Sequence, residues 1–286
     1  MAYESYAEFL DALEKAGELI RVSEPIATEL EITELADREM KKPGGGKALL
    51  IEQPTVNGEV SPMPVAINTM GSAKRIAMAL GAESVGAVAE ELGSLVQAKP
   101  PTGLRDAMAL LGQALGLRHA RPKKVKRGPC KEFIHRFDSP ASRTEPWPSA
   151  PDVNDPSTLT PNPSTLLNLP IMQCWPLDGG RFLTLPCVVT SDPDTGDRNL
   201  GMYRMQVYDD QSTGMHWQLQ KVAARHGRRY YETGERMPVA VFLGGDPVYP
   251  FCATAPMPDG LDEFLLAGYL RRKSVEMVQC ETCDLE

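Results

Sequence analysis

Three polar residues in the last third of the sequence could together bind ions. Asn199 offers a neutral amide oxygen to a cation, and the Arg204 guanidinium can donate two parallel hydrogen bonds to a carboxylate or phosphate. Glu263 follows the turn-forming run 256–260 and offers a carboxylate. Amide and carboxylate oxygens suit Mg²⁺ or Mn²⁺, with phosphate oxygens completing the coordination shell. One prediction is therefore a divalent-metal site formed by Asn199 and Glu263.

Ordinary structural roles are open to the same residues. A carboxylate in the first turn of a helix compensates the helix dipole, which would explain Glu263 without a metal. An arginine on a strand often forms only a surface ion pair, which would explain Arg204. Asn199 and Arg204 are expected on one strand, where they would face opposite sides unless a bulge near Gly201 redirects one of them. The sequence alone leaves these alternatives open.

His216 and Lys221 are further candidates close to these residues. His216 precedes Trp217 on an expected strand, where a histidine is more often packed or hydrogen-bonded than catalytic. Lys221 opens an expected helix and can contact either a phosphate or solvent. A glycine turn at 244–247 lacks the GxGxxG spacing of a dinucleotide site, and the sequence contains no Walker or GxSxG motif.

Strands are expected to position most of these residues. The apolar runs 180–190 and 200–208 predict two strands joined by the turn-forming run 191–196. Further strands are expected at 131–135, 215–219, 239–243 and 275–278, and helices at 221–227 and 262–270. A mostly-β stretch with hairpin turns favours a barrel-like domain over residues 126–286.

The first 125 residues show a different pattern. Helices are expected at 5–19, 28–41, 72–80, 83–95 and 104–115, and short apolar strands at 19–22, 48–52 and 64–68. Ser5 is a candidate N-cap for the first helix, with Glu8 three residues later. The alternation of helices and strands predicts an α/β domain over residues 1–125.

The composition is that of an ordinary globular protein. The chain has 286 residues, of which 42% are hydrophobic and 24% charged, and its net charge is −8. The negative charge argues against nucleic-acid binding. The one basic run, 118–127, is either a solvated surface or a docking patch for an acidic partner or a membrane surface. The N-terminus lacks the apolar region of a secretion signal, and no apolar run is long enough to cross a bilayer.

Six cysteines are present, and four of them lie in apolar surroundings, as buried thiols in a reducing cytoplasm do. The other two, Cys280 and Cys283, have CxxC spacing. No second pair lies at the separation typical of a zinc site. We therefore expect the pair to be either structural or accidental.

Taken together, six groups of residues resemble motifs of the UbiD family of decarboxylases, which use prenylated FMN. The matching segments are 67–81, 178–186, 198–206, 214–218, 238–240 with 245–247, and 258–260 with Glu263 and 267–268. The resemblance covers essentially the whole chain. It implies an N-terminal α/β domain, a split β-barrel that binds the flavin, and a C-terminal oligomerisation domain.

The resemblance also implies roles for individual residues. Asn199 and Glu263 match ligands of a divalent metal, usually manganese, that bridges to the flavin phosphate. Seven residues match positions that contact the cofactor: Met202, Tyr203, Arg204, His216, Trp217, Gln218 and Lys221. Arg204 also matches the catalytic arginine near the substrate carboxylate. A potassium ion is an optional further ligand, near Ala253, Thr254 and Met257.

The activity implied by the resemblance is non-oxidative decarboxylation. The substrate class is an aromatic or α,β-unsaturated acid, with aryl or prenyl-aryl acids of ubiquinone and menaquinone synthesis as the typical case. A flavin prenyltransferase would supply the cofactor. The resemblance further implies a cytoplasmic protein, with peripheral membrane contact left open, and a homo-oligomer for the full-length chain.

Two departures from the family pattern leave alternatives open. Relatives often carry a histidine where this chain has Gln220 and Lys221, so the third metal ligand is not assigned. Relatives also continue past Glu286 into a segment with an acidic proton donor, so we expect a truncated chain that lacks this donor. One alternative is a catalytically incomplete fragment that binds flavin or phosphate without turnover. Another is an FMN reductase, although nothing in the sequence marks a nicotinamide site.

Overall fold

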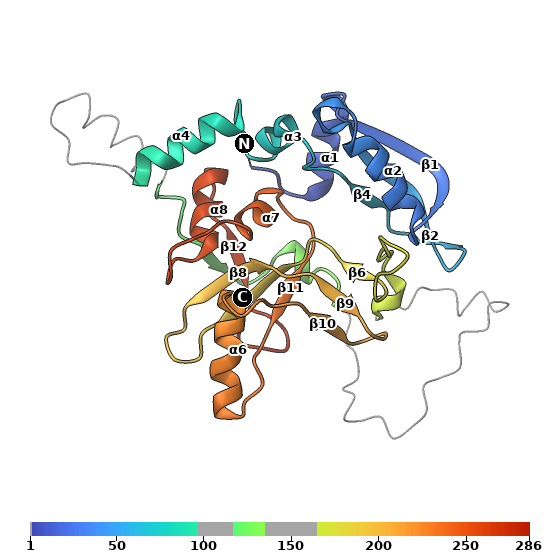
Figure 1. Ribbon diagram of the computed structural model, residues 1–286. Coiled ribbons are helices and arrows are strands. Elements are labelled where there is room, and N and C mark those ends of the chain that lie inside the picture. Colours follow the sequence, from blue (N-terminus) through green and yellow to red (C-terminus); the bar gives the residue numbers. More distant parts are fainter. Residues whose placement is uncertain (1, 97–116, 135–164) are drawn as a thin grey trace, which may run out of the picture.

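A computed structural model of the chain describes residues 2–96, 117–134 and 165–286 (Figure 1). Its mixture of helices and strands confirms the predicted α/β character. The predicted helix at 104–115 lies outside the described residues. None of the described helices is both long and apolar enough to cross a membrane.

In the described residues up to 96, the N-terminal part is a four-stranded sheet with four helices. In chain order its elements are α1 (Tyr6–Lys15), β1 (Leu19–Ala27), α2 (Glu31–Met40), the 3₁₀ turn η1 (Pro43–Gly45), β2 (Ala48–Val56), β3 (Glu59–Val60), β4 (Val65–Ile67), α3 (Ala73–Ala79) and α4 (Val85–Val96). Strand β2 is central, parallel to β1 and antiparallel to β3 and β4. The predicted N-cap is confirmed, because the Ser5 hydroxyl accepts a hydrogen bond from the Glu8 N–H.

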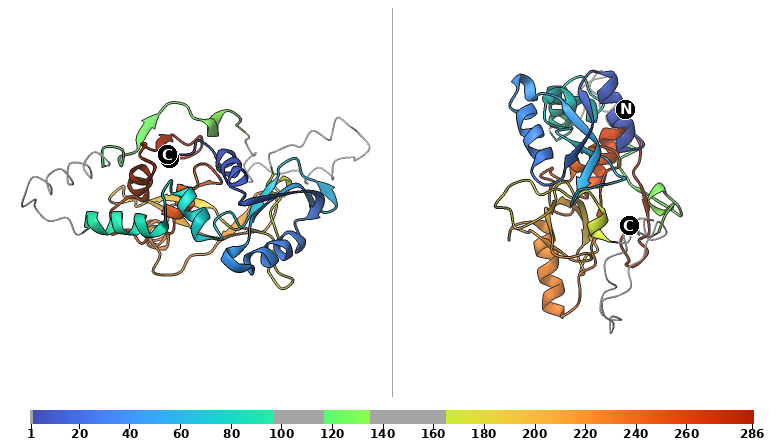
Figure 2. Two further views of the ribbon diagram at one scale, coloured as in Figure 1. Left: turned by 90° about the horizontal axis from the view of Figure 1, so that it is seen from above. Right: turned by 90° about the vertical axis from the view of Figure 1, so that its right-hand side faces the viewer.

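Helices α1 and α2 cover opposite faces of this sheet. Successive residues of a strand face opposite sides. Ala48 of β2 packs with Phe9 of α1, whereas the next residue, Leu49, packs with Ile32 of α2. Both views in Figure 2 show the sheet between these helices. Burial on both faces explains why the start of β2 is a continuous apolar run.

In the described ranges 117–134 and 165–286, the second part contains short strands in three small sheets. Its elements are β5 (Lys123–Val125), η2 (Pro129–Lys131), η4 (Leu166–Asn168), β6 (Phe182–Leu183), β7 (Cys187–Ser191), β8 (Arg198–Met202), β9 (Met205–Val207), β10 (Thr213–Met215), α6 (Val222–Thr233), β11 (Ala240–Phe242), α7 (Val248–Cys252), α8 (Glu263–Arg271) and β12 (Glu276–Val278). The sheet orders are β11-β7-β8, β10-β9-β6 and β12-β5. Across the described ranges these strands form no closed barrel, so the split barrel stays a prediction.

The largest apolar core is shared by the two parts. Leu80 and Val88 from the N-terminal part pack in one cluster with Val189, Leu200 and Phe264 from the second part. This cluster lies on one face of the β7–β8 pair. The predicted domain boundary at residue 125 stays a prediction, and the apolar packing is continuous across it.

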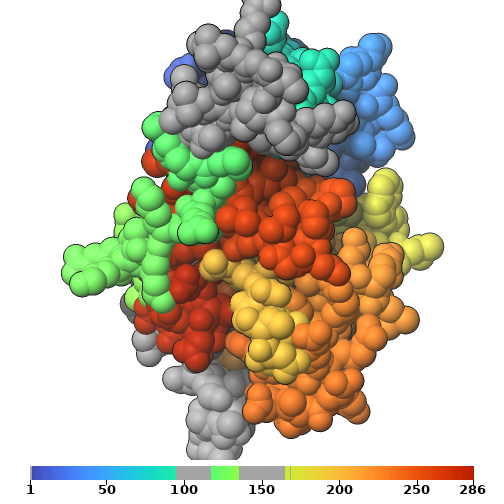
Figure 3. Space-filling model, turned by 90° about the vertical axis from the view of Figure 1, so that its left-hand side faces the viewer, coloured from blue at the N-terminus to red at the C-terminus, as the bar shows by residue number. Residues whose placement is uncertain are grey.

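The basic run 118–127 lies at the surface, where strand β5 pairs with β12 (Figure 3). Lys124 forms an ion pair with Glu286, with 2.5 Å between the Lys124 Nζ and the Glu286 Oε1. Arg121, Lys123 and Lys126 are exposed. Both interpretations of this run, a solvated surface and a docking patch, are compatible with that placement.

Two strands predicted as continuous are each broken in the structure. The run 180–190 divides into β6 and β7 at Pro186, which lacks the N–H that a sheet ladder needs. The run 200–208 divides into β8 and β9, which belong to different sheets, with Tyr203 and Arg204 between them. The prediction that Asn199 and Arg204 share one strand is therefore wrong. The strand predicted at 215–219 is also wrong beyond Met215, where β10 ends.

The predicted bulge near Gly201 is not present. Strands β7 and β8 pair in continuous register, with Gly201 opposite Val188. Gly201 is needed for a different reason: a Cβ there would lie 2.4 Å from ring atoms of Tyr203. The predicted strand at 131–135 is also wrong in its described part, where Pro129–Lys131 forms a 3₁₀ turn. His135 lies outside the described residues.

The packing at Gly201 gives a stability prediction. We expect Gly201→Ala to lower the free energy of unfolding by about 1–3 kcal/mol, because the added methyl group overlaps the Tyr203 ring. Gly93→Ala in α4 is the matched control, because a Cβ at Gly93 meets nothing within 4 Å. It should raise stability by about 0.5–1 kcal/mol through helix propensity. Urea titration of the three proteins measures both effects, and equal stability of the two variants would contradict the prediction.

Candidate functional site

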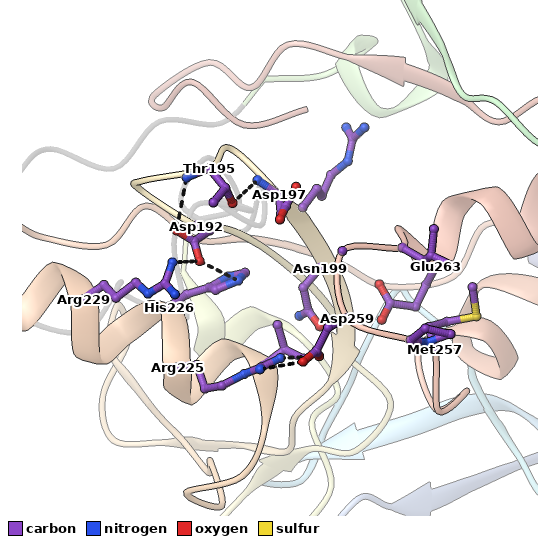
Figure 4. Close-up of a pocket in the computed structure, with 15 residues that line it drawn as sticks. Asp192, Thr195, Asp197, Asn199, Arg225, His226, Arg229, Met257, Asp259 and Glu263 are labelled. Atoms are coloured by element: carbon purple, nitrogen blue, oxygen red, sulfur yellow. Dashed lines mark hydrogen bonds and ion pairs between the residues drawn. The ribbon is translucent and has the colours of Figure 1, made fainter.

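A cavity of about 230 Å³ lies between strand β8, the first turns of helix α6 and the segment that leads into α8. Polar side chains from all three elements line it, and Figure 4 shows them. Asn199 and Glu263 both line this cavity, and the Glu263 carboxylate is directed toward Asn199. The structure thus brings the two predicted metal ligands to one place, although they are far apart in the sequence. Their role as ligands stays a prediction.

Asn199 is held by its neighbours on the α6 side of the sheet. Only 4% of the residue is exposed. Its amide nitrogen lies 3.5 Å from Thr190 Oγ1 and 3.4 Å from the Tyr203 hydroxyl. Both contacts use the nitrogen as donor, so the amide oxygen stays available as a ligand.

Glu263 is a buried carboxylate at the first position of helix α8. The Asp262 side chain caps the helix by accepting a hydrogen bond from the Phe264 N–H. Glu263 Oε2 accepts a hydrogen bond of 2.7 Å from the Leu200 N–H, and the residue is 7% exposed. Among the described residues no Lys, Arg or His forms an ion pair with it. Burial raises the pKa of Glu263 to about 7, because no nearby cation offsets the cost of removing the charge from water.

The arginines around the cavity are already paired with carboxylates. Arg225 donates to both oxygens of Asp259, at 2.6 and 3.0 Å, and Arg198 donates to Asp262 at 2.8 Å. Arg229 donates to Asp192. Burial opposes ionisation of Asp192, but the hydrogen bond from Arg229 and two backbone N–H groups hold its pKa below the usual range. The three arginines at the rim of the cavity thus each have a carboxylate partner, whereas the Glu263 carboxylate has no cationic partner in the described part of the chain.

His226 of α6 also lines the cavity and was not among the predicted site residues. It is 4% exposed, its Nδ1 lies 3.0 Å from Thr190 Oγ1, and its Nε2 lies 3.9 Å from Asp192 Oδ2. Burial lowers the pKa of His226, with Asp192 acting in the opposite direction, so the imidazole is predominantly neutral at pH 7. The sequence did carry a signal: Arg225, His226 and Arg229 lie within one helical turn of each other.

None of the seven predicted cofactor contacts lines this cavity. Arg204 is exposed, and its guanidinium lies 4.3 Å from the centre of the Phe182 ring. The exposed members of the predicted set also include His216, Gln218 and Lys221. Met202 and Trp217 are half-buried, and Tyr203 is buried with its hydroxyl against Asn199. The structure therefore joins only Tyr203 directly to the candidate metal ligands.

The donor set fits a hard divalent cation in part. Asn199 and Glu263 supply two oxygen ligands, and Glu263 lacks the positive partner that a buried carboxylate requires. Within residues 2–96, 117–134 and 165–286, no group of three or more His, Cys, Asp or Glu side chains is placed to hold a metal ion. A cation here would take further ligands from oxygens that this set does not supply, such as those of a phosphate.

Comparison with protein families gives two matches. Residues 10–95 match the 3-octaprenyl-4-hydroxybenzoate carboxy-lyase N-terminal domain, and residues 149–286 match the Rift-related domain of the same carboxy-lyase. Both belong to the family called UbiD. Asn199 and Glu263 fall within the second match.

Curated relatives extend the comparison to the whole chain. An uncharacterised protein of Archaeoglobus fulgidus is 39% identical over 286 residues, which are 100% of this chain and 52% of the relative. An uncharacterised protein of Aquifex aeolicus is 38% identical over 99% of this chain and 52% of its own length. The chain thus spans about half the length of these relatives.

Solved structures show the same fold. Vanillic acid decarboxylase of Sedimentibacter hydroxybenzoicus, in its closed form, superposes with a TM-score of 0.72 and 22% identity over 99% of this chain and 52% of its own. HmfF from Pelotomaculum thermopropionicum, in complex with FMN, gives a TM-score of 0.72 and 23% identity over 98% of this chain and 52% of its own.

The raised pKa of Glu263 predicts a pH-dependent stability term. The folded carboxyl has a pKa of about 7 and the unfolded one about 4.5, so the folded state binds more protons between these values. Its contribution to stability is present below pH 4.5 and is lost as pH rises through 7. Glu263→Gln, which cannot ionise, should therefore gain up to about 3 kcal/mol relative to wild type between pH 4.5 and 8.

Urea titrations of wild type and variant in EDTA, from pH 4.5 to 8, measure this difference. Glu276→Gln is the matched control, because Glu276 is an exposed carboxylate on β12. Its stability relative to wild type gives the baseline for the loss of one exposed carboxylate. A flat difference for Glu263→Gln would show that the buried carboxyl titrates normally.

Proposed function

Because the chain belongs to the UbiD family of carboxy-lyases, we propose that it provides the metal- and flavin-binding part of a non-oxidative decarboxylase. The proposed substrates are aromatic or α,β-unsaturated carboxylic acids, such as the aryl or prenyl-aryl acids of quinone synthesis. The observation that carries the proposal is the buried, unbalanced Glu263 carboxylate, which faces the Asn199 amide in one cavity. A buried carboxylate without a cation is costly unless a ligand compensates it.

Prenylated FMN is the proposed cofactor. HmfF, whose fold this chain shares, was solved with FMN and, in an evolved dimeric form, with prFMN. When bound, the modified flavin supplies the electron sink that loss of CO₂ from an unsaturated carbon requires. In this proposal Asn199 and Glu263 would hold Mn²⁺ or a similar divalent metal, which would help to anchor the flavin phosphate. A flavin prenyltransferase would supply the cofactor, and K⁺ is an optional further ion.

Arg204 is the proposed substrate-binding residue. Its exposed guanidinium stacks on the Phe182 ring, which restricts the orientation of the planar group. A guanidinium held in this way can donate two parallel hydrogen bonds to a substrate carboxylate. Arg204 would thus orient the carboxylate, and the remaining residues of the predicted cofactor set would contact the flavin.

The metal-binding part of the proposal is tested by Mn²⁺ titration in the presence of FMN. We expect Glu263→Gln and Asn199→Ala to weaken Mn²⁺ binding by at least about 10-fold, because the first replaces the anionic ligand with a neutral amide and the second removes an oxygen ligand. Glu276→Gln, again the matched control, should bind as wild type does. Free Mn²⁺ is measured by its electron paramagnetic resonance signal. Equal affinity in all four proteins would rule out the Asn199–Glu263 site.

The catalytic part is tested on protein co-expressed with a flavin prenyltransferase. Release of CO₂ from a panel of aryl acids should fall by at least about 100-fold in Arg204→Ala, with metal and flavin content unchanged. Arg204→Lys should recover only part of the activity, because an ammonium cannot form the bidentate contact. Arg38→Ala, at an exposed ion pair with Glu34, is the control. Bound flavin and metal without CO₂ release from wild type would instead support the binding-only alternative.

A further inference from the structure

A continuous line of buried polar side chains leads from Asn199 into helix α6. Its members are Asn199, Thr190, His226 and Asp192, and none of them is more than 8% exposed. The Asn199 Nδ2 lies 3.5 Å from Thr190 Oγ1, which lies 3.0 Å from His226 Nδ1. His226 Nε2 lies 3.9 Å from Asp192 Oδ2. Cross-strand pairing of Thr190 with Asn199 places the first two side chains on the same face of the β7–β8 pair.

The donors and acceptors along this line can be assigned by starting from Asp192, the residue farthest from Asn199. Arg229 and two backbone N–H groups donate to Asp192, which is therefore an ionised acceptor. An acceptor beside Nε2 favours the His226 tautomer with its proton on Nε2. Nδ1 is then an acceptor and takes the Thr190 hydroxyl proton. The Thr190 oxygen is left to accept from the Asn199 amide nitrogen.

This direction decides which end of the Asn199 amide faces the cavity. If the nitrogen donates to Thr190, the oxygen must point the other way, toward the side that Glu263 occupies. Were the amide flipped, its NH₂ group would face the cavity and would repel a cation. In this arrangement the Nδ1 lone pair of His226 accepts from the Thr190 hydroxyl, and Nε2 carries the proton and faces Asp192 Oδ2 at 3.9 Å. Neither nitrogen therefore has a free lone pair for a metal, although the residue lines the cavity.

We propose that Asp192, His226 and Thr190 are positioning residues that hold the Asn199 amide with its oxygen toward a bound divalent cation. The inference rests on the proposed metal site. It assigns to that site three residues that contact no metal and instead hold a ligand in place. Outer partners of this kind orient a ligand, and their removal typically costs about 10–100-fold in metal affinity.

The experiment measures Mn²⁺ affinity in the presence of FMN for a pair of Thr190 variants. Thr190→Val keeps the side-chain shape but removes the hydroxyl, and should weaken binding by about 10-fold or more. Thr190→Ser keeps the hydroxyl and should bind within about threefold of wild type. Thermal unfolding of both variants, monitored by circular dichroism, verifies that they are folded.

A double-mutant cycle separates positioning from general damage to the site. In an Asn199→Ala background there is no amide left to orient, so Thr190→Val should cause no further loss of affinity. An equal loss in both backgrounds would overturn the inference, as would unchanged affinity in Thr190→Val. If wild type itself binds no Mn²⁺, the metal site of the proposed function fails and the inference falls with it. If wild type and Thr190→Val bind Mn²⁺ equally well, only the positioning role fails and the metal site stands.

A pair of variants at His226, the hydrogen-bond partner of Thr190, provides a second test. His226→Asn retains an acceptor close to the position of Nδ1, and His226→Leu removes it. Affinity should follow the order wild type, His226→Asn, His226→Leu. The reverse order of the two variants would contradict the proposed direction of the hydrogen bonds.

Discussion

The outer edge of strand β8 is closed by the segment that contains α7 and α8. In the described sheet β8 is an end strand, so alternate N–H groups point away from β7 and need acceptors. The Leu200 N–H donates to the Glu263 carboxylate, and the Met202 N–H donates to the Ala253 carbonyl. An edge that would otherwise be open to another strand is thereby fixed to helix α8. The same bond draws a carboxylate into the interior, where it faces Asn199 on the same strand.

This edge contact determines how the rest of the core is arranged. Leu200, which donates the bond, and Phe264, which follows Glu263, both belong to the core that the N-terminal helices share. Helix α8 is also held close to the chain before β5, since a Cβ at Gly268 would lie 2.3 Å from the His119 carbonyl oxygen. At its far end Arg271 forms a buried ion pair with Asp246, at 2.7 Å. A helix constrained at three points cannot withdraw its first residue from the cavity without disturbing the core.

Local sequence patterns predicted the elements that carry the candidate ligands. They did not predict features that depend on contacts between residues far apart in the sequence. Helix α8 was predicted within one residue at each end, because a turn and an acidic cap precede a clear apolar period. Helix α6 was predicted to end at Gly227 but continues to Thr233. Gly227 is not a helix end but a packing position, since a Cβ there would lie 2.7 Å from Trp217. His226 was missed for a related reason. Its partners, Thr190 and Asp192, are more than 30 positions away, and no local pattern marks them.

The break between β8 and β9 has a consequence for the proposed chemistry. A single strand through Arg204 would have placed the arginine and Asn199 on one sheet. Instead Tyr203 folds back over Gly201 to contact Asn199, and Arg204 immediately precedes strand β9 of the other sheet, with its guanidinium over the Phe182 ring. Within the proposed function, this separation assigns the metal and flavin phosphate to the α6 side and the substrate carboxylate to the β9 side. The turn at Tyr203 is thus the element that separates the Asn199 side chain from the Arg204 guanidinium.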